Sequence, residues 1–431
     1  TAYEIRLSLV GSEMCIRDRI SGGQVTIQHQ YVFTDTTTAN LVTSPNPAHE
    51  GNIVLQIDQP LLRNFGSDVA RAQVLLAANM ERDSIQELKG TLIDVVTQVE
   101  QAYWNLVRAR DDLYILQRLQ VRGEDVLGVL RKRLDAKPIN RADAAAAVEE
   151  RRANVTRGQR VLRSASDQLK TLINHPEWTV GSEVLLLPVD TGLDQPVEYS
   201  LVDSLNTAFA NRPEVQRAII SLDNTSIRQK VADSARLPQL NLRALTRFSS
   251  LQSTFGGSYD ALAEGRFIDY QLGLQFEMPI GNRAAEANYT TTQIQRMEAN
   301  AAYRNTLQQV SGQVKTSLRD VVSNYELIGE TRVARIAAAE NLRQLLLEEQ
   351  ILAALTPEFL DIKLRRQDEL AGAEQRENQA IAEYATALAQ LHQACGTTLD
   401  HNRIVFEVPN LRRPQVRDSD LFPDYPLEPE K

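Results

Sequence analysis

The residue types that most often carry catalysis or metal binding are few and scattered in this sequence. The five histidines have no metal-ligand spacing: His29, His49, His175, His392 and His401. The sequence contains no His-Glu-x-x-His, no glycine-rich phosphate loop and no nucleophile elbow. The glycine pair in Phe255-Gly256-Gly257-Ser258 is more typical of a loop between strands than of a phosphate cradle. We therefore expect no enzyme, no cofactor and no metal.

The cysteines exclude two further kinds of site. Cys15 and Cys395 are too few for a disulfide framework or a cysteine-rich zinc site. Residues 1–19 resemble translated sequencing-adapter sequence, with SLVGSEMCIRDR as the diagnostic string. We exclude these residues from the fold prediction. On this interpretation Cys395 is the only native cysteine, and we expect the true N-terminus to be missing.

The composition favours long helices over a thick globular core. Of the 431 residues, 42% are hydrophobic and 24% are charged, but only 6% are aromatic. The net charge is −9 with both signs interspersed, so a nucleic-acid binder is disfavoured. No run of 18 apolar residues occurs, which excludes a transmembrane helix but not short membrane strands.

An internal repeat organises the chain. Pro60 and Pro138 are 78 residues apart, as are Pro279 and Pro357, and a shift of 219 residues superposes the two pairs. The same shift aligns the segment LQIDQP, which ends at Pro60, with LQFEMP, which ends at Pro279. The sequence is therefore a tandem duplication. Each half begins with two predicted strands and continues with two long predicted helices.

The predicted strands alternate apolar and polar residues. The apolar positions are Val25, Ile27, Tyr31 and Phe33; Ile53, Leu55 and Ile57; Leu240, Leu242 and Ala244; and Leu272, Leu274, Phe276 and Met278. Polar residues such as Gln56, Asp58, Gln275 and Glu277 occupy the opposite face. A period of two gives each strand one apolar and one polar wall. The pattern alone fits a sheet half-buried on a soluble core as well as a sheet in a membrane.

The predicted helices are too long to bury their apolar stripes inside one globule. Leu92, Val95 and Val99 belong to a coiled-coil-like seam that repeats at three- and four-residue steps. A helix with this seam is on the order of 100 Å long. The predicted helices cover residues 67 to about 134, about 140 to 174, about 283 to 353, and 357 to 395. Such helices need each other or other subunits.

A shorter block joins the two halves. Leu185–Pro188 is predicted to be a small strand. Asn211-Arg212-Pro213-Glu214 predicts a helix start with a capping Asn, a first-turn proline and an acidic residue, and that helix ends at about Arg236. The tail after Asp400 is rich in proline and acidic residues and is predicted to be an extended strap.

Six short motifs, in a fixed order, link the sequence to a known family. They are Gln59-Pro60-Leu61-Leu62-Arg63, the segment DQLKTLIN that ends at Asn174, Arg212-Pro213-Glu214, Leu237-Pro238-Gln239-Leu240, Pro279-Ile280-Gly281-Asn282-Arg283 and Gly396-Thr397-Thr398-Leu399. Between about residues 24 and 407 the chain resembles the TolC-like outer-membrane efflux proteins. These are the channel subunits of tripartite efflux and type I secretion systems.

The resemblance implies a mostly helical homotrimer in the bacterial outer membrane, with a large periplasmic part. Each subunit would give four strands to a shared 12-stranded β-barrel and two helical hairpins to a trimeric α-barrel. The corresponding regions are 20–66 and 239–281 for the strands, 67–174 and 282–395 for the hairpins, and 175–238 and 396–431 for an equatorial region and a tail. Apolar strand residues would face lipid, polar ones would face water, and loops 36–50 and 254–268 would be extracellular.

The resemblance also implies functional positions. Pro60 and Pro279 would mark the bends from strand to helix, because proline interrupts a strand ladder. The hairpin tips, near 131–145 and 350–368, would contact a periplasmic adaptor. Tip positions are Lys137, Pro138, Asp143, Thr356 and Pro357, where the family's usual glycines are absent. The expected gate residues are Asp361, Arg365 and Asp368, whose ion pairs would hold the tips together until an adaptor competes for them.

Two functions are therefore open. One is a passive exit duct, coupled to a periplasmic adaptor and an inner-membrane pump that supplies the energy. The alternative is a soluble periplasmic coiled-coil spacer or adaptor without a pore. The alternating strands favour the duct, since a spacer needs no lipid-facing wall.

Overall fold

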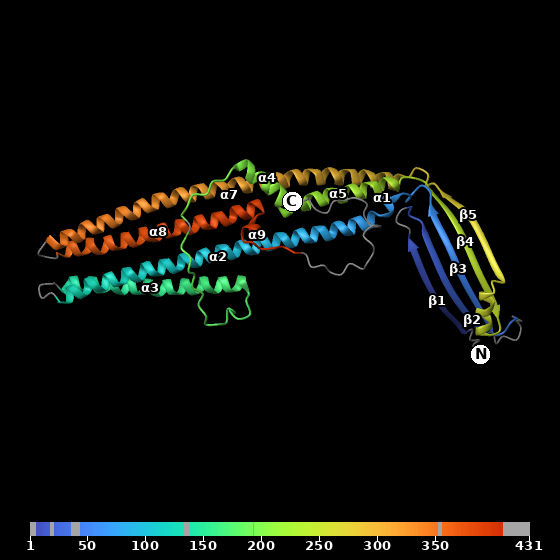
Figure 1. Ribbon diagram of the computed structural model, residues 1–431, viewed down its shortest axis with the longest axis horizontal. Coiled ribbons are helices and arrows are strands. Elements are labelled where there is room, and N and C mark those ends of the chain that lie inside the picture. The colour runs from blue at the N-terminus through green and yellow to red at the C-terminus, as the bar shows by residue number, and fades with distance from the viewer. Residues whose placement is uncertain are drawn as a thin grey trace. The chain divides into compact units, whose positions relative to one another are not determined.

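The computed structural model describes residues 6–17, 21–35, 44–132, 138–192, 194–351 and 356–407. The chain divides into two compact units. The first comprises residues 1–84 and 217–305, and the second comprises residues 85–216 and 306–431. Figure 1 labels the helices and strands in chain order.

The first unit contains an antiparallel sheet with the strand order β1-β2-β3-β4-β5 (Figure 1). The strands are β1 (Arg6–Arg17), β2 (Gln24–Asp35), β3 (Ala48–Pro60), β4 (Gln239–Gln252) and β5 (Phe267–Glu277). Strands β2 to β5 confirm the four strands predicted from the sequence. β1 pairs with β2 and lies within residues 1–19, whose assignment to adapter sequence remains a prediction.

The register brings the two halves of the repeat together and sorts side chains by polarity. β3 of the first half pairs with β4 of the second half. Across the sheet, Val25 lies opposite Ile57, Ile57 opposite Ala244, and Ala244 opposite Leu272. Because side chains alternate along each strand, this row and its neighbours two residues away share one face. The predicted apolar wall is therefore continuous over four strands.

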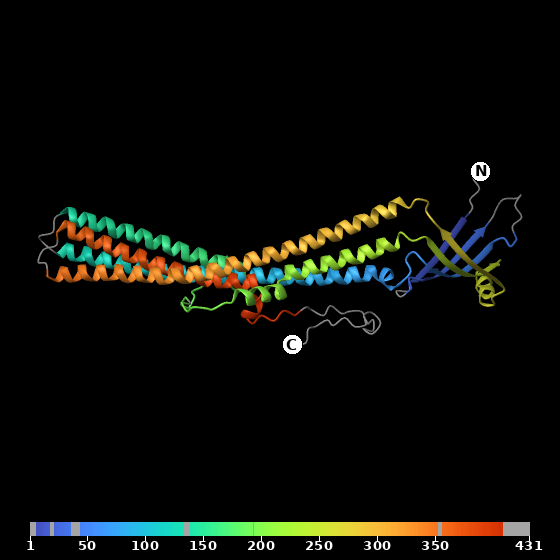
Figure 2. The same cartoon turned by 90° about the horizontal axis from the view of Figure 1, so that it is seen from above.

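Two long helical hairpins follow the strands. They consist of α2 (Ala72–Lys132) with α3 (Pro138–Ile173), and α7 (Arg283–Ile351) with α8 (Pro357–Cys395). In the second unit these four helices run side by side (Figures 1 and 2). Leu106 of α2 packs on Leu162 and Leu169 of α3. Val321 and Ile328 of α7 pack in the same way on Tyr384 of α8. The Leu106 end of the predicted α2 seam is thus buried against α3, whereas Val95 of the same seam is 40% exposed.

The helix boundaries differ from the prediction by a few residues. The first long helix is split, because α1 (Ser67–Ala70) is separated from α2 by a turn at Arg71. Among the described residues, no helix is sufficiently long and apolar to span a membrane.

The segment that joins the two halves contains two corrections. Leu185–Pro188 forms no strand, because the Leu186 N–H donates to the Ser166 side chain of α3 (3.0 Å) instead of to another strand. Asn211 does not cap a helix, because it is the last residue of α4 (Leu201–Asn211), and α5 (Pro213–Ser234) begins two residues later. Arg212 between them is extended, with φ −67° and ψ 124°.

The loop predicted at Phe255-Gly256-Gly257-Ser258 is the third correction. These residues begin a helix, α6 (Phe255–Ala263), that packs on β3 and β4. Its N-cap is Thr254, whose hydroxyl accepts a hydrogen bond from the Gly257 N–H at 3.2 Å. This cap gives the Gly257 N–H a hydrogen-bond partner in the first turn, where no helical carbonyl is available. The helix therefore begins here despite the low helix propensity of Gly256 and Gly257.

The end of α8 is fixed by a turn and a pair of stacked histidines. Gly396 adopts φ +71°, and a Cβ added there would lie 3.0 Å from the Asn211 carbonyl carbon. The chain then reverses into α9 (Thr398–His401), where the His401 ring stacks on His392 with centroids 4.0 Å apart. Burial, reinforced by His401, lowers the pKa of His392 to about 4. The folded state therefore favours neutral His392.

This burial predicts acid sensitivity. As pH falls from about 6.5 towards 4, His392 in the unfolded chain takes up a proton that the folded chain excludes. The folded state should lose up to about 3 kcal/mol over that range. We expect thermal unfolding, followed by circular dichroism between pH 7.5 and 5, to depend less on pH in His392→Gln than in the wild type. His175→Gln is the control, and an unchanged pH dependence in His392→Gln would contradict the prediction.

Candidate functional site

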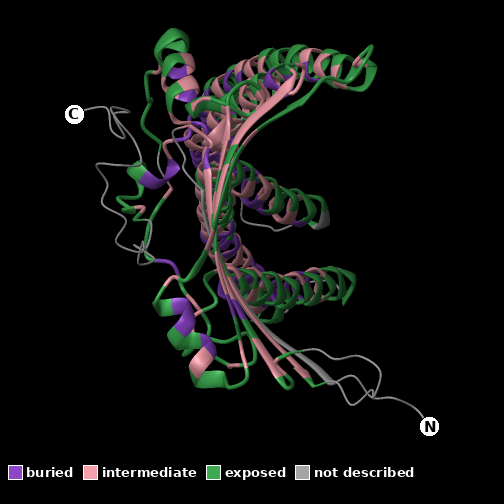
Figure 3. Cartoon of the chain, turned by 90° about the vertical axis from the view of Figure 1, so that its right-hand side faces the viewer, coloured by how far each residue is buried: buried purple, intermediate pink, exposed green. Residues whose placement is uncertain are grey.

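The sheet exposes its apolar wall to solvent in the single chain. On β5, Leu272 is 77% exposed, Leu274 68% and Phe276 62%. Intermediate and exposed residues dominate the strands (Figure 3). Soluble monomers rarely expose continuous apolar patches of this kind. The wall therefore has to be covered by lipid or by protein.

The opposite face of the same strands carries charges. The Arg243 Nε donates to Asp58 Oδ1 at 2.6 Å and so links β4 to β3. The Gln56 side-chain amide also donates to Asp58. Further along the sheet, Arg247 lies directly opposite Asp269 on β5. A sheet with one apolar and one charged face matches a boundary between lipid and water.

The bends after Pro60 and Pro279 are made by the residues that follow the prolines. Pro60 is the last residue of β3, and the chain turns at Asn64 (φ +65°) and Gly66 (φ +103°) before α1 begins. After Pro279 the chain turns at Gly281 (φ +80°), and α7 begins at Arg283. Pro60 ends β3 and Pro279 lies two residues beyond the end of β5, whereas left-handed asparagine and glycine residues turn the chain towards the helices.

The predicted adaptor-contact residues lie at helix ends. Lys137 lies outside the described residues. Pro138 and Pro357 are the first residues of α3 and α8, a position where proline costs no helical hydrogen bond. Thr356 caps α8 by accepting the Phe359 N–H at 3.2 Å. Asp143 is exposed on the second turn of α3. Pro138, Thr356 and Pro357 thus begin helices and Asp143 lies within one, and their role in adaptor contact remains a prediction.

The three predicted gate residues form two separate ion pairs. Asp361 and Arg365 pair with each other one turn apart on α8, at 2.7 Å, and each side chain is 67% exposed. Asp368 instead accepts a hydrogen bond from Arg151 of α3, with Arg151 Nη2 2.9 Å from Asp368 Oδ1. Only Asp368 therefore joins one hairpin to the other.

Arg151 is a central polar residue that the sequence analysis missed. Its side chain is only 4% exposed, although it lies between Val148 and Val155 in the apolar stripe of α3. Its Nη1 donates to the Leu119 carbonyl of α2 (3.2 Å) and to Gln367 Oε1 of α8 (2.9 Å). Its Nη2 also donates to the Leu364 carbonyl at 3.1 Å. One guanidinium thus connects three helices.

The surroundings of Arg151 are adapted to hold it. A Cβ added to Gly123 of α2 would lie 2.8 Å from Arg151 Nη1, so this glycine makes room for the guanidinium. Burial lowers the pKa of Arg151, while the charge of Asp368 opposes that shift. An arginine in an otherwise apolar seam is the sequence signal that could have identified this site.

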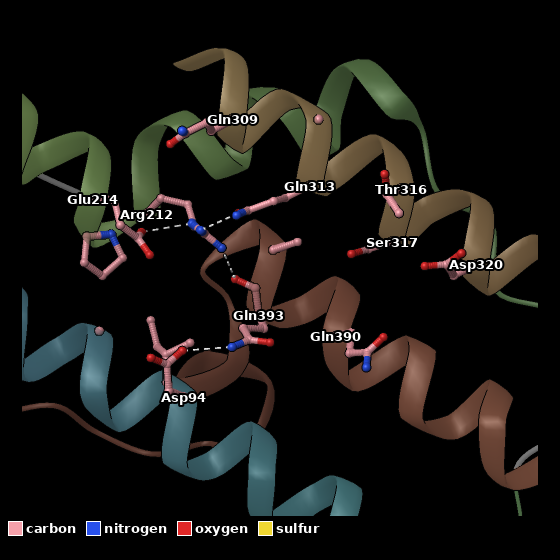
Figure 4. A pocket seen from close by; sticks show the side chains of 15 residues that line it. Asp94, Arg212, Glu214, Gln309, Gln313, Thr316, Ser317, Asp320, Gln390 and Gln393 are labelled. Atoms are coloured by element: carbon pink, nitrogen blue, oxygen red, sulfur yellow. Dashed lines mark hydrogen bonds and ion pairs between the residues drawn. The ribbon is translucent and has the colours of Figure 1, made fainter. Parts of the chain in front are cut away.

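A polar cavity of about 930 Å³ lies in the second unit (Figure 4). Arg212 reaches into its wall and donates to the Gln393 carbonyl (3.1 Å) and to Gln313 Oε1 (2.6 Å). Its Nε also lies 3.0 Å from Glu214 Oε2. These contacts connect the start of α5 with α7 and α8. In the described part of the chain, no group of three or more His, Cys, Asp or Glu residues could hold a metal ion.

Comparison with known proteins identifies the fold. No family model matches the sequence, and no curated protein matches it either. Among solved structures, the open-state outer membrane channel MtrE of Neisseria gonorrhoeae aligns over 92% of this chain and 81% of its own, at 18% identity and TM-score 0.67. The CmeC outer membrane channel of Campylobacter jejuni aligns over 92% and 78%, at 16% identity and TM-score 0.63.

A third match is the outer membrane protein VceC of Vibrio cholerae, which aligns over 91% of this chain and 87% of its own, at 15% identity and TM-score 0.65. The chain therefore has the fold of these outer membrane proteins. The fold predicted from the sequence, long helical hairpins joined to a small antiparallel sheet, is confirmed.

The geometry of the inter-hairpin contact predicts unequal effects for its two partners. Arg151→Met should lower the free energy of unfolding by about 2–3 kcal/mol, because three acceptors besides Asp368 lose a buried donor. Asp368→Asn should cost less than about 1 kcal/mol, because the carboxylate is 56% exposed. Thermal or denaturant unfolding measures both, with Arg365→Ala as an exposed control. Equal losses for Arg151→Met and Asp368→Asn would refute this assignment.

Proposed function

We propose that this chain is the subunit of a passive exit duct in the bacterial outer membrane. The observation that carries the proposal is the exposed apolar wall of the sheet, in a chain with the fold of outer membrane channels. Strand residues Leu272, Leu274 and Phe276 would contact lipid. Asp58 and Arg243 would face a water-filled lumen.

Three copies of the chain would close the sheet into a barrel. A sheet in lipid cannot leave an open edge, because unpaired backbone groups find no water there. Among the described strands, β5 pairs only with β4. The outer edge of β2 is paired only with β1, which lies in the adapter-like segment. In a chain that lacks this segment, β2 of one subunit could pair with β5 of the next. Four strands from each of three subunits would then form the 12-stranded barrel.

The helical hairpins would form the wall of a periplasmic tunnel, with the gate at their tips. Asp368 and Arg151 would act as one of the contacts that hold α8 against the α2–α3 hairpin. Arg365 and Asp361 lie about one and two turns closer to the tip than Asp368, and both expose their charges. An adaptor that offers other partners to these charges would release α8.

The proposed duct needs partners but carries out no chemistry. A periplasmic adaptor would dock at the tips, at Lys137, Pro138, Asp143, Thr356 and Pro357, and would connect the duct to an inner-membrane pump. The pump would supply the energy for export, so the duct itself would need no catalytic residue and no cofactor.

A soluble coiled-coil spacer is the competing function, and the sheet distinguishes the two. A spacer would have to cover Leu272, Leu274 and Phe276 with its own residues, yet these side chains are among the most exposed in the sheet. The long hairpins alone would fit either function.

The two faces of β5 provide a matched test. Leu274→Arg places a charge on the lipid-facing wall, where an arginine costs from about 0–1 kcal/mol per subunit near the interfaces to about 2–4 kcal/mol at mid-bilayer. Gln275→Arg places the same charge on the adjacent residue of the opposite face and should be tolerated. Trimer assembly in outer-membrane fractions, followed by native gel electrophoresis, measures the difference. If Leu274→Arg and Gln275→Arg assemble equally well, the chain is not the proposed duct.

The gate can be tested by conductance. Asp368→Ala combined with Arg365→Ala should raise single-channel conductance in planar bilayers several-fold, because the Asp368–Arg151 and Arg365–Asp361 ion pairs are both removed. Arg343→Ala removes an exposed pair with Glu340 on α7 and should leave the conductance unchanged. A closed conductance retained by the double variant would place the gate elsewhere.

A further inference from the structure

The helix α6 lies on the apolar face of the sheet. On β3 and β4 it contacts the row that contains Gly51 and Ser250, where Ser258 Oγ lies 2.8 Å from Ser250 Oγ. Gly51 also lies opposite Tyr31 of β2. Counting in steps of two along β4, Ser250 shares its face with Ala244 and Leu242. α6 therefore covers one end of the same wall that would face lipid.

The contact is close and specific. Ser258, Ala261 and Leu262 of α6 are buried, and Ser258 is fully so. A Cβ added to Gly51 would lie 2.7 Å from Leu262 Cδ1 and 2.9 Å from Ser250 Oγ. The absence of a side chain at Gly51 thus allows the helix to approach the sheet. This is a built docking position and not an incidental loop conformation.

The remaining surface of α6 and the adjacent end of β2 form an aromatic cluster, defined by His29, Tyr31, Phe255 and Tyr259. Tyr259 stacks on His29, and its hydroxyl lies 3.2 Å from His29 Nε2. Phe255 meets Tyr31 edge to face, with centroids 5.1 Å apart. Phe255 nevertheless remains 55% exposed and Tyr259 37% exposed. Aromatic residues with one polar and one apolar contact are typical of the boundary between lipid tails and headgroups.

The distance along the strands from their helix-proximal end to the aromatic cluster agrees with the height of the apolar band of a membrane barrel. From Leu240, near the start of β4, to Ser250 the strand advances ten residues, which corresponds to about 34 Å. At the tilt of barrel strands this distance spans a height of about 25 Å, the height of the apolar band of a membrane barrel. If Leu240 marks one edge of the band, α6 marks the other edge.

We infer that α6 is a membrane-interface anchor. It holds Phe255 and Tyr259 on the outside of the barrel, at the boundary between headgroups and acyl chains. This boundary lies at the end of the sheet away from the bends after Pro60 and Pro279. The exposed charges of Asp260, Glu264 and Arg266 follow on the same segment and extend towards the headgroups and water. This inference rests on the proposed function, because α6 can meet lipid only if the sheet spans a membrane.

Tryptophan fluorescence tests the proposed membrane barrel and the α6 anchor separately. Phe255→Trp and Leu274→Trp are each made in a Trp104→Phe, Trp178→Phe background, and the assembled protein is reconstituted in phosphatidylcholine vesicles. Lipids brominated on the acyl chain quench tryptophan in contact with them, and iodide quenches tryptophan in water. Both variants should lose about half of their fluorescence in brominated lipid and resist iodide. The protein that retains only Trp178, a residue 41% exposed in the second unit, is the lipid-free control.

The outcomes are distinguishable. If brominated lipid quenches Leu274→Trp but not Phe255→Trp, the membrane barrel is supported and the membrane-interface role of α6 is refuted. This conclusion is the same whether iodide quenches residue 255 or protein shields it. If brominated lipid quenches neither variant, the sheet does not contact lipid and the proposed function itself is refuted. Gly51→Ala should displace α6 and reduce the lipid quenching of Phe255→Trp, whereas Gly273→Ala, whose added Cβ meets nothing within 4 Å, should not. Unchanged quenching in Gly51→Ala would contradict the docking of α6 through Gly51.

Discussion

The constraint on which the structure depends is the need to satisfy the backbone of a sheet that has one apolar face. Strand alternation sends Leu272, Leu274 and Phe276 to one side, while the Asp58–Arg243 pair lies on the other. If the apolar face meets lipid, every strand edge has to be paired, because no water is available to hydrogen-bond it. The five strands in the described part of the chain are too few to close a membrane barrel. In lipid, the sheet would then have to pair its edge strands with those of other subunits.

The tandem repeat supplies the pieces that such an assembly needs. Each half contributes a strand pair and a helical hairpin, and the halves meet where β3 pairs with β4. The long helices obtain their stability mainly from paired seams such as that of Leu106 with Leu162, since an exposed single helix of this length would bury little apolar surface. A single duplicated pattern thus builds both a sheet with one apolar wall and a pair of helical hairpins.

The sequence was sufficient to predict the elements whose signal is periodic. Strand alternation and helical seams repeat over many residues, so β2 to β5 and the four long helices were predicted within a few positions. Features that depend on one contact were missed. α6 follows two glycines and exists because Thr254 caps it and Gly51 leaves room beneath it. The tail from residue 408 onward lies outside the described residues, so its predicted strap conformation stays a prediction.

The candidate gate was only partly predictable for the same reason. Asp361, Arg365 and Asp368 were chosen from their place near a hairpin tip, but their partners depend on how helices from different halves pack. Asp361 and Arg365 lie one turn apart on α8 and pair with each other, as the local spacing allows. The partner of Asp368, in contrast, is Arg151, 217 residues away in sequence. No local pattern in the sequence reports a contact of that separation.

The two halves of the repeat differ at several positions where the gate is proposed, and these differences have a physical meaning. Under the shift of 219 residues, Arg151 corresponds to Leu370, which is 5% exposed in the core around α8. Asp361 and Arg365 correspond to Ala142 and Ala146 on α3. The tip of α3 is therefore alanine-rich where α8 carries the exposed Asp361–Arg365 pair, and Arg151 replaces an apolar core residue of the other hairpin. Two hairpins with identical apolar contacts would have no reason to separate at one place and not at another. A buried arginine is costly to leave unpaired, but the Asp368 carboxylate is more than half exposed and can exchange partners with water or protein at little cost. The Asp368 carboxylate is thus the partner of Arg151 that can be exchanged most easily, while Arg151 keeps its acceptors on α2 and α8.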